Sequence, residues 1–191
     1  MAGYAMYKKT VARKSVTKKE SGFSLIDLLF TLVLLSVLLS LAFPAYQYLM
    51  VEIRLLALTE RITSALNYAR SEAIRHRSVV ILCPSDNGKT CSGQWRNGWI
   101  ITLGRYAANV PENNLLRVYP PLNKHEVLIW HGAGRRDYVQ LNPDGSAYGH
   151  NGSFVVCVKV LTTSTAWLIK VSTTGRIRID KDLGLQSNCH Y

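Results

Sequence analysis

The 191-residue sequence lacks the spacings that most catalytic and metal sites need. None of its four cysteines forms a Cys-x-x-Cys pair, the spacing that is typical of structural zinc sites. Its five histidines are scattered, and no order of Ser, His and Asp suggests a catalytic triad. Gly132-Ala133-Gly134 begins like a dinucleotide fingerprint but lacks the next glycine and the helix. We therefore expect no enzyme, no metal site and no cofactor.

Long apolar runs are also scarce, because only one is long enough to cross a bilayer. From Phe23 to Phe43 the only strongly polar side chain is Asp27, and about 20 apolar residues suffice for a membrane-spanning helix. A lone carboxylate in such a helix is expensive to bury and is usually paired or functional. The sequence predicts a transmembrane helix at 23–43 in which Asp27 needs a partner.

Acidic residues are few, since 12 Asp and Glu stand against 23 Lys and Arg and give a net charge of +11. Six basic residues and Glu20 put +5 of this charge into residues 1–22 and leave +6 for the rest of the chain; the six are Lys8, Lys9, Arg13, Lys14, Lys18 and Lys19. Basic residues before a membrane helix hold that end in the cytoplasm. We expect the chain after Pro44 to lie outside, where only the remaining surplus bears on an acidic partner.

The four cysteines, Cys83, Cys91, Cys157 and Cys189, all follow the helix, in a compartment where disulfides persist. Three pairings are possible. We favour Cys83 with Cys91, which closes a short polar loop, and Cys157 with Cys189, which would tie the C-terminus to a strand. In the chain-entropy account the longer closure contributes about 3–4 kcal/mol. A zinc site is the alternative, but the spacing does not suit it.

The helix is expected to continue beyond Pro44 to residue 76 with one apolar stripe. Apolar residues recur there at steps of three and four, with charged residues mostly between them; they are Val51, Leu55, Leu58, Ile62, Ala65, Ala69 and Ala73. Such a stripe indicates a helix that packs on another layer.

Residues 77–191 contain short runs rich in β-forming residues, and turn residues separate these runs. The predicted strands are Ser78–Cys83, Trp99–Leu103, Leu115–Tyr119, Val127–Trp130, Tyr138–Leu141, Phe154–Val160, Ala166–Val171 and Arg176–Ile179. The predicted fold class is α+β, with a long helix packed on an antiparallel β-sheet head domain.

The N-terminus resembles the type IV pilin signature. Gly22, Phe23, Ser24, Leu25, Ile26 and Asp27 fill its places in order, after a basic leader and before the long apolar helix. The resemblance implies that a prepilin peptidase removes leader 1–22 by cutting after Gly22 and methylates the new amino terminus at Phe23. It also implies that Asp27, where most pilins have Glu, pairs with the Phe23 amine of a neighbouring pilin. The chain would sit in the inner membrane with its head in the periplasm, and then enter an extracellular pilus.

An ordinary secretory signal is the alternative interpretation of this segment. The run is basic and then apolar, and Ser40-Leu41-Ala42 could serve as a cleavage site with small residues. The length of the apolar run and the position of Asp27 count against it. Sequencing of the mature N-terminus distinguishes Phe23 from Phe43.

The head resembles the minor pilins of the FimT and GspH family, and FimT most closely. The residues that carry this resemblance are Cys83–Cys91, Trp95, Gly98–Ile101, Thr174-Gly175-Arg176-Ile177-Arg178 and Cys189. In FimT proteins of transformable bacteria the Gly-Arg-x-Arg motif is implicated in binding incoming DNA. The resemblance therefore implies a DNA-binding segment at Gly175, Arg176 and Arg178.

Strand geometry gives this segment a physical interpretation. Alternate side chains share a face, so Arg176 and Arg178 would point one way, about 7 Å apart, while Ile177 and Ile179 point into the core. Lys170 joins the arginines if the preceding turn has an odd number of residues and lies opposite if it has two. Lys181 would follow in the tail held by Cys189, and Lys170 and Lys181 are the further candidate DNA contacts beside the two arginines.

The sequence is compatible with two functions. One is a minor pilin that holds double-stranded DNA without sequence preference during uptake in natural transformation. The other is a purely structural minor pilin, or a GspH-like pseudopilin of type II secretion, in which the two arginines form only a solvated face.

Overall fold

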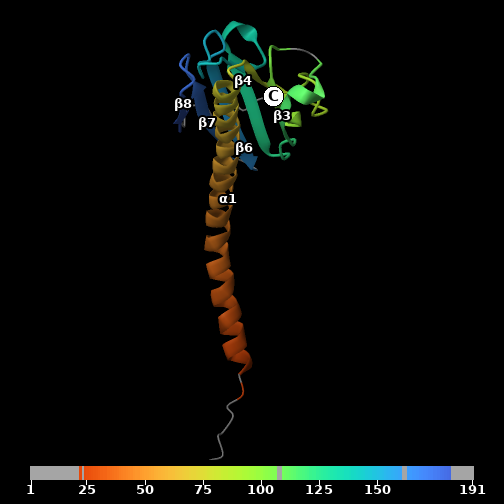
Figure 1. Cartoon of the computed structure of the whole chain (residues 1–191). Helices are drawn as coiled ribbons and strands as arrows, with labels where there is room; N and C mark the ends of the chain where they lie inside the picture. The colour runs from red at the N-terminus through yellow and green to blue at the C-terminus, as the bar shows by residue number, and fades with distance from the viewer. Residues whose placement is uncertain (1–21, 23, 107–108, 161–162, 182–191) are drawn as a thin grey trace, which may run out of the picture. The chain divides into compact units, whose positions relative to one another are not determined.

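The structure, a computed structural model of the chain, describes residues 22, 24–106, 109–160 and 163–181. Within them, one long helix precedes eight strands (Figure 1). Helix α1 spans Leu25–His76. The strands are β1 (Val80–Pro84), β2 (Trp99–Leu103), β3 (Leu115–Tyr119), β4 (Glu126–Gly132), β5 (Val139–Leu141), β6 (Gly152–Val160), β7 (Thr163–Val171) and β8 (Ile177–Asp180). The α+β prediction is confirmed, and each predicted strand lies within a few residues of an observed one.

The chain divides into two compact units, Met1–Phe43 and Pro44–Tyr191. In the described part of the first unit, which contains α1 up to Phe43, the apolar side chains of the helix are exposed. Across the described residues, α1 is the one helix with the length and hydropathy to span a membrane. At its start, the backbone N–H of Ser24 donates to Asp27 Oδ2 at 3.3 Å. Asp27 therefore caps its own helix, as carboxylates commonly do at helix N-termini.

The second unit contains two antiparallel sheets of four strands. The strand order is β3-β2-β1-β5 in the first sheet and β4-β6-β7-β8 in the second. All seven residues of the predicted apolar stripe of α1 are buried, as are inward side chains of both sheets. One core therefore joins the C-terminal part of α1 to both sheets. In Figure 1 the strands gather around this part of the helix.

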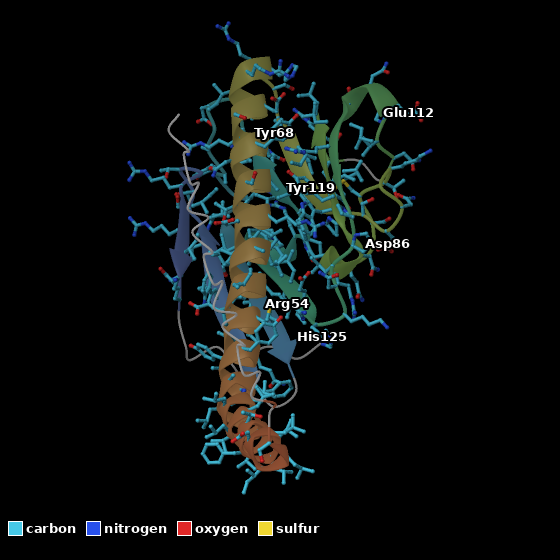
Figure 2. All side chains as sticks on the ribbon, turned by 90° about the horizontal axis from the view of Figure 1, so that it is seen from below. Arg54, Tyr68, Asp86, Glu112, Tyr119 and His125 are labelled. Atoms are coloured by element: carbon cyan, nitrogen blue, oxygen red, sulfur yellow. A yellow bond between two sulfur atoms is a disulfide. The ribbon has the colours of Figure 1, made fainter. Side chains whose placement is uncertain are left out.

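Stacked cations and rings attach α1 to the first sheet. The guanidinium of Arg61 lies 4.4 Å from the centre of the Trp99 ring, and Trp99 stacks on Tyr119 at 5.2 Å. Arg117 lies over Tyr119 and over Tyr68 of α1, both labelled in Figure 2. Burial lowers the pKa of Arg61, because desolvation disfavours the charged form. The ring faces partly compensate through cation–π attraction.

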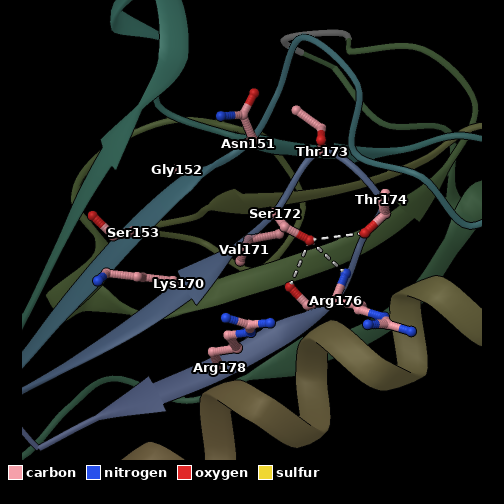
Figure 3. A pocket seen from close by; sticks show the side chains of 10 residues that line it. All are labelled: Asn151, Gly152, Ser153, Lys170, Val171, Ser172, Thr173, Thr174, Arg176 and Arg178. Carbon is pink, nitrogen blue, oxygen red and sulfur yellow. Dashed lines mark hydrogen bonds between the residues drawn. The ribbon is translucent and has the colours of Figure 1, made fainter.

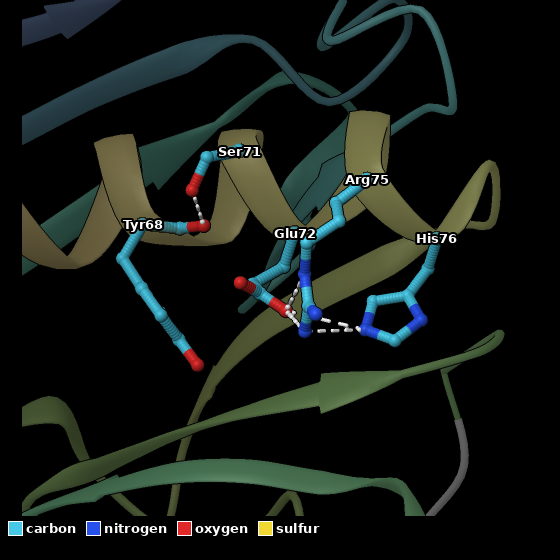
Figure 4. A network of polar contacts seen from close by, with 5 residues as sticks. All are labelled: Tyr68, Ser71, Glu72, Arg75 and His76. Carbon is cyan, nitrogen blue, oxygen red and sulfur yellow. Dashed lines mark hydrogen bonds and ion pairs between the residues drawn. The ribbon is translucent and has the colours of Figure 1, made fainter.

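The last turn of α1 holds a small ionic network (Figure 4). Arg75 Nε donates to Glu72 Oε2 at 3.1 Å, and His76 Nε2 lies 3.2 Å from the same oxygen. The hydrogen bond from Arg75 lowers the pKa of the Glu72 carboxyl. The Glu72 side chain is largely buried at 10% exposure, so this network lets an anion sit at the edge of the core.

The loop after β1 is closed by a disulfide between Cys83 and Cys91, with Cα atoms 5.5 Å apart. Within the loop, Asp86 Oδ1 accepts from the backbone N–H of Gln94 at 3.3 Å and from Asn97 Nδ2 at 2.9 Å. Cys157, fully buried on β6, is also disulfide-bonded. Cys189 lies outside the described residues, so its pairing with Cys157 stays a prediction.

Candidate functional site

An open groove of about 650 Å³ lies where β6 begins and β7 ends, beside the turn that leads into β8 (Figure 3). Its lining carries three cations and no acidic side chain. The lining residues are Asn151, Gly152, Ser153, Lys170, Val171, Ser172, Thr173, Thr174, Arg176 and Arg178. Hydroxyl and amide groups make up most of the remaining polar lining, so the groove offers donors to an anion.

The turn at 172–176 is tied together by Ser172. Its backbone N–H donates to the Arg176 carbonyl at 2.9 Å, and its hydroxyl accepts from the Arg176 N–H at 3.1 Å. The same hydroxyl lies 3.0 Å from that of Thr174, and the Gly175 N–H donates to the Ser172 carbonyl at 2.9 Å. These bonds, partly drawn in Figure 3, hold Arg176 at a defined place beside the groove.

The outer side of this turn is held by α1 and by the loop after β5. Arg70 Nη1 donates to the Gly175 carbonyl at 3.1 Å, and the Ala147 N–H donates to the Thr173 carbonyl at 2.9 Å. Gly175 is buried with φ of 72°, and a Cβ there would lie 2.1 Å from the Gly145 carbonyl oxygen. Gly175, expected as part of a binding motif, thus has a packing role: only glycine allows this close approach.

The strand register answers the question left open for Lys170. Val171 pairs with Ile177, so the intervening turn has an odd number of residues, and Lys170 lies directly opposite Arg178. Both side chains are exposed, and they extend from neighbouring strands in Figure 3. The structure therefore brings Lys170 and Arg178 together on one face.

Lys170 is also engaged by an anion. Its Nζ lies 2.7 Å from Asp180 Oδ2, and the two side chains are 54% and 44% exposed. An ion pair this accessible contributes about 0–1 kcal/mol. A phosphate that approaches Lys170 therefore competes with Asp180. Because the ion pair is weak, Asp180 opposes this contact only slightly.

Arg176 and β8 depart from the expected alternation. Arg176 lies in the turn before β8 begins at Ile177, and in the view of Figure 3 its side chain extends in a different direction from that of Arg178. Ile177 packs against the core as expected, but Ile179 is 44% exposed. The expectation that Ile179 is a core residue is wrong, because β8 is an edge strand and its end is left uncovered.

Lys181 does not join the groove. Its Nζ lies 4.5 Å from the centre of the Trp167 ring. Trp167 faces the core, so Lys181 lies on the helix-facing side of the sheet, where both residues line a small pocket with Val51 and Leu55. The expectation that Lys181 adds to the basic face is not met. Side chains alternate between the two faces of a strand, and Lys181, one residue beyond the end of β8, lies on the opposite face from Arg178 and Asp180.

The residues of the proposed processing and assembly site are only partly described. Gly22 is exposed, and Asp27 makes the capping contact given above. Phe23 lies outside the described residues. Among the described residues, no group of three or more His, Cys, Asp and Glu side chains is arranged to hold a metal ion.

Several residues that line the groove were not predicted from the sequence. Asn151 and Ser153 come from β6 and the segment before it, and only the pairing of β6 with β7 brings them beside Lys170. Thr173 and Thr174 belong to a polar turn whose composition alone is common in loops. The one signal available was the adjacency of the Ser172–Thr174 run to the two arginines.

Comparisons with known proteins agree with this architecture. The sequence profile of the family described as "Type II transport protein GspH" matches residues 58–175. A crystal structure of the type IV minor pilin FimU of Pseudomonas aeruginosa is similar at a TM-score of 0.50 and 19% identity, covering 68% of this chain and 90% of that one. FimU in another crystal form gives 0.45 and 19%, covering 63% and 88%. A comparison with curated protein sequences finds no match.

Proposed function

On the premise that this chain belongs to the GspH family, we propose that it is a minor type IV pilin that binds double-stranded DNA in the groove at β6, β7 and β8. The fold is that of a minor pilin, with an apolar N-terminal helix and a β-rich head. The proposal adds a ligand to that fold. Binding would be independent of sequence and would serve uptake of DNA in natural transformation.

The observation that carries the proposal is the charge of the groove. Lys170, Arg176 and Arg178 line it, and none of its lining residues is acidic. Guanidinium and ammonium groups neutralise phosphates and release counterions, which supplies most sequence-independent affinity for DNA. With three cations the affinity of a single subunit is expected to be weak, and log K should fall with log salt at a slope of about 2.7.

Family membership alone does not supply this ligand. The family match ends at Gly175, so Arg176 and Arg178 lie beyond it. The DNA proposal rests on the resemblance of the Gly-Arg-x-Arg segment to FimT and on the groove that this segment lines.

Assembly is proposed from the N-terminal residues. A prepilin peptidase would cut after Gly22, and the Asp27 carboxylate would offset the Phe23 amine of a neighbouring pilin within the helical bundle. An unpaired charge is costly in such a low-dielectric setting. The chain would be stored in the inner membrane with its head in the periplasm and then join the extracellular pilus, with other pilins as partners.

A fluorescence anisotropy titration tests DNA binding. The full chain in nonionic detergent is titrated into a labelled duplex between about 50 and 200 mM salt. The double variant Arg176→Ala/Arg178→Ala is expected to lose most affinity and to flatten the salt dependence. The matched control Lys89→Ala/Lys124→Ala removes the same charge from loops that do not line the groove. Equal losses in both variants, or no binding at low salt, would overturn the proposal.

A purely structural role is the second candidate, and the GspH match itself favours it. In that case the chain is a pseudopilin or a priming subunit with protein partners alone. Pilus assembly that depends on the chain, combined with an absence of DNA binding at low salt, would support this role.

A further inference from the structure

The second sheet carries a row of polar residues, three exposed and one half-buried, that runs across all four of its strands. Pairing is direct at each step: Arg178 of β8 faces Lys170 of β7, Lys170 faces Ser153 of β6, and Ser153 faces His131 of β4. Directly paired residues point to the same face of a sheet. We call Arg178, Lys170, Ser153 and His131 the cross-strand row.

Figure 3 shows three members of the row, Ser153, Lys170 and Arg178, on three successive strands. His131, Lys170 and Arg178 are exposed and Ser153 is half-buried, so the row is accessible from end to end. Neighbouring strands lie about 4.8 Å apart, which makes the row about 14 Å long. At a rise of about 3.4 Å per base pair, this length corresponds to about four base pairs of a duplex.

The two sides of the row differ in polarity. One step toward the sheet centre, the same face carries Ile129, Val155 and Leu168, and Asp180 at the end on β8. The three apolar residues belong to a cluster with buried Cys157 and Ala166, which offers nothing to a phosphate, and the Asp180 carboxylate repels one. On the other side lie Asn151 and the polar turn 172–174, which line the groove. The accessible polar band therefore follows the row, perpendicular to the strands.

We propose that bound DNA lies across the sheet at right angles to its strands, with one phosphate backbone along the cross-strand row and His131 as the contact at its far end. The inference rests on the proposed function, since it extends the DNA site from the groove at β6, β7 and β8 to the opposite edge strand, β4. Arg178 and Lys170 supply charge, the Ser153 hydroxyl supplies a donor, and the His131 imidazole supplies a ring nitrogen donor. The footprint then spans the whole sheet, whereas binding in the groove alone, which Ser153 already lines, would not involve His131.

Substitutions of opposite charge at His131 test the inference. His131→Arg is expected to raise the affinity for a labelled duplex about three- to tenfold at low salt and to steepen the slope of log K against log salt by about 0.9. His131→Glu is expected to lower the affinity by a similar factor. A role in folding alone would give both variants the same direction of change, so the opposite signs identify a contact.

His125 provides the matched control. It is exposed and lies just before β4 at the end opposite to His131, about 20 Å away along the strand. His125→Arg and His125→Glu change the net charge by the same amounts and should alter binding by less than twofold.

The outcomes separate the two proposals. If Arg176→Ala/Arg178→Ala abolishes binding while the His131 variants behave like the His125 variants, the DNA site stands and the row is wrong. If the arginine double variant binds normally, the DNA site itself is wrong. Opposite shifts at His131 that are absent at His125 support the row.

Discussion

Lys170 and Asp180 form an ion pair of 2.7 Å on the face of the second sheet that also carries Arg178. Asp180 is the one acid in contact with a groove cation among the ion pairs of the described residues. It thereby lowers the positive potential beside the groove and occupies a donor that a phosphate would use. A DNA phosphate bound at this face would therefore compete with Asp180 for Lys170.

Asp180→Asn is therefore expected to strengthen DNA binding. Removal of the carboxylate frees Lys170, and because an exposed pair contributes about 0–1 kcal/mol, the gain in affinity should be about two- to fivefold. Anisotropy titrations at low salt measure it. Glu112→Gln, which removes an exposed acid from the short 3-10 helix Glu112–Asn114 before β3, controls for net charge. An unchanged or weaker affinity in Asp180→Asn would contradict the role assigned to Lys170.

Gly175→Ala is expected to destabilise the head by about 2–4 kcal/mol, because it combines backbone strain with overpacking. The residue has φ of 72°, and its new Cβ would lie 2.1 Å from the Gly145 carbonyl oxygen. Thermal unfolding followed by tryptophan fluorescence reports on the head, where all four tryptophans lie.

Gly149→Ala is the control for this prediction. Gly149 has φ of 76°, but nothing lies within 4 Å of its Cβ position. The Gly149→Ala variant should lose only the stability that backbone strain removes, about 1 kcal/mol. Equal losses at the two glycines would show that the contact with Gly145 is unimportant.

Glu72 should make the head sensitive to acid. The hydrogen bond from Arg75 lowers the pKa of this carboxyl in the folded state. Its contribution to stability is therefore present above the unfolded pKa of about 4.3 and is lost as the pH falls through the lower folded value. Glu72→Gln should show a smaller loss of stability between about pH 5 and pH 3 than the unchanged chain.

Glu60→Gln is the comparison, since Glu60 is exposed on the same helix. Its unfolding profile in acid should follow that of the unchanged chain. If Glu72→Gln retains the full acid sensitivity, the Arg75 contact does not stabilise the fold.

Arg61→Ala is expected to destabilise the head by about 1–2 kcal/mol through loss of the cation–π contact with Trp99. Arg61 also donates to the carbonyl of Pro120, so the variant leaves that acceptor without its partner. Denaturant unfolding measures the difference. Arg54→Ala, at an exposed position on the same helix, should remain within about 0.5 kcal/mol of the unchanged chain.

Much of the fold could be predicted from the sequence because its signals are local. The buried stripe from Val51 to Ala73 follows from the helical period, and the strands follow from β-branched runs between turn residues. The separation of the strands into two sheets could not be predicted, since pairing joins residues far apart in the chain. Strand β1 pairs with both β2 and β5, and no local sequence pattern predicts these partners.

The candidate site was predictable only in part, for the same reason. Arg176 and Arg178 are visible as a motif, whereas the positions of Lys170 and Lys181 depend on turn length and on where β8 ends. His131 and Ser153 enter through cross-strand register alone, and Gly175 reveals its packing role only through its contact with the loop after β5.

The five-residue turn between Val171 and Ile177 determines which side chains of β8 meet solvent. A one-residue insertion or deletion there would reverse the parity of the strand, turning Arg178 toward the core and Ile177 outward. Related chains that differ in this loop by a single residue would thus lose the basic surface while keeping every arginine. Loop length is then a property to compare, together with residue identity, when asking which relatives carry the same exposed basic face.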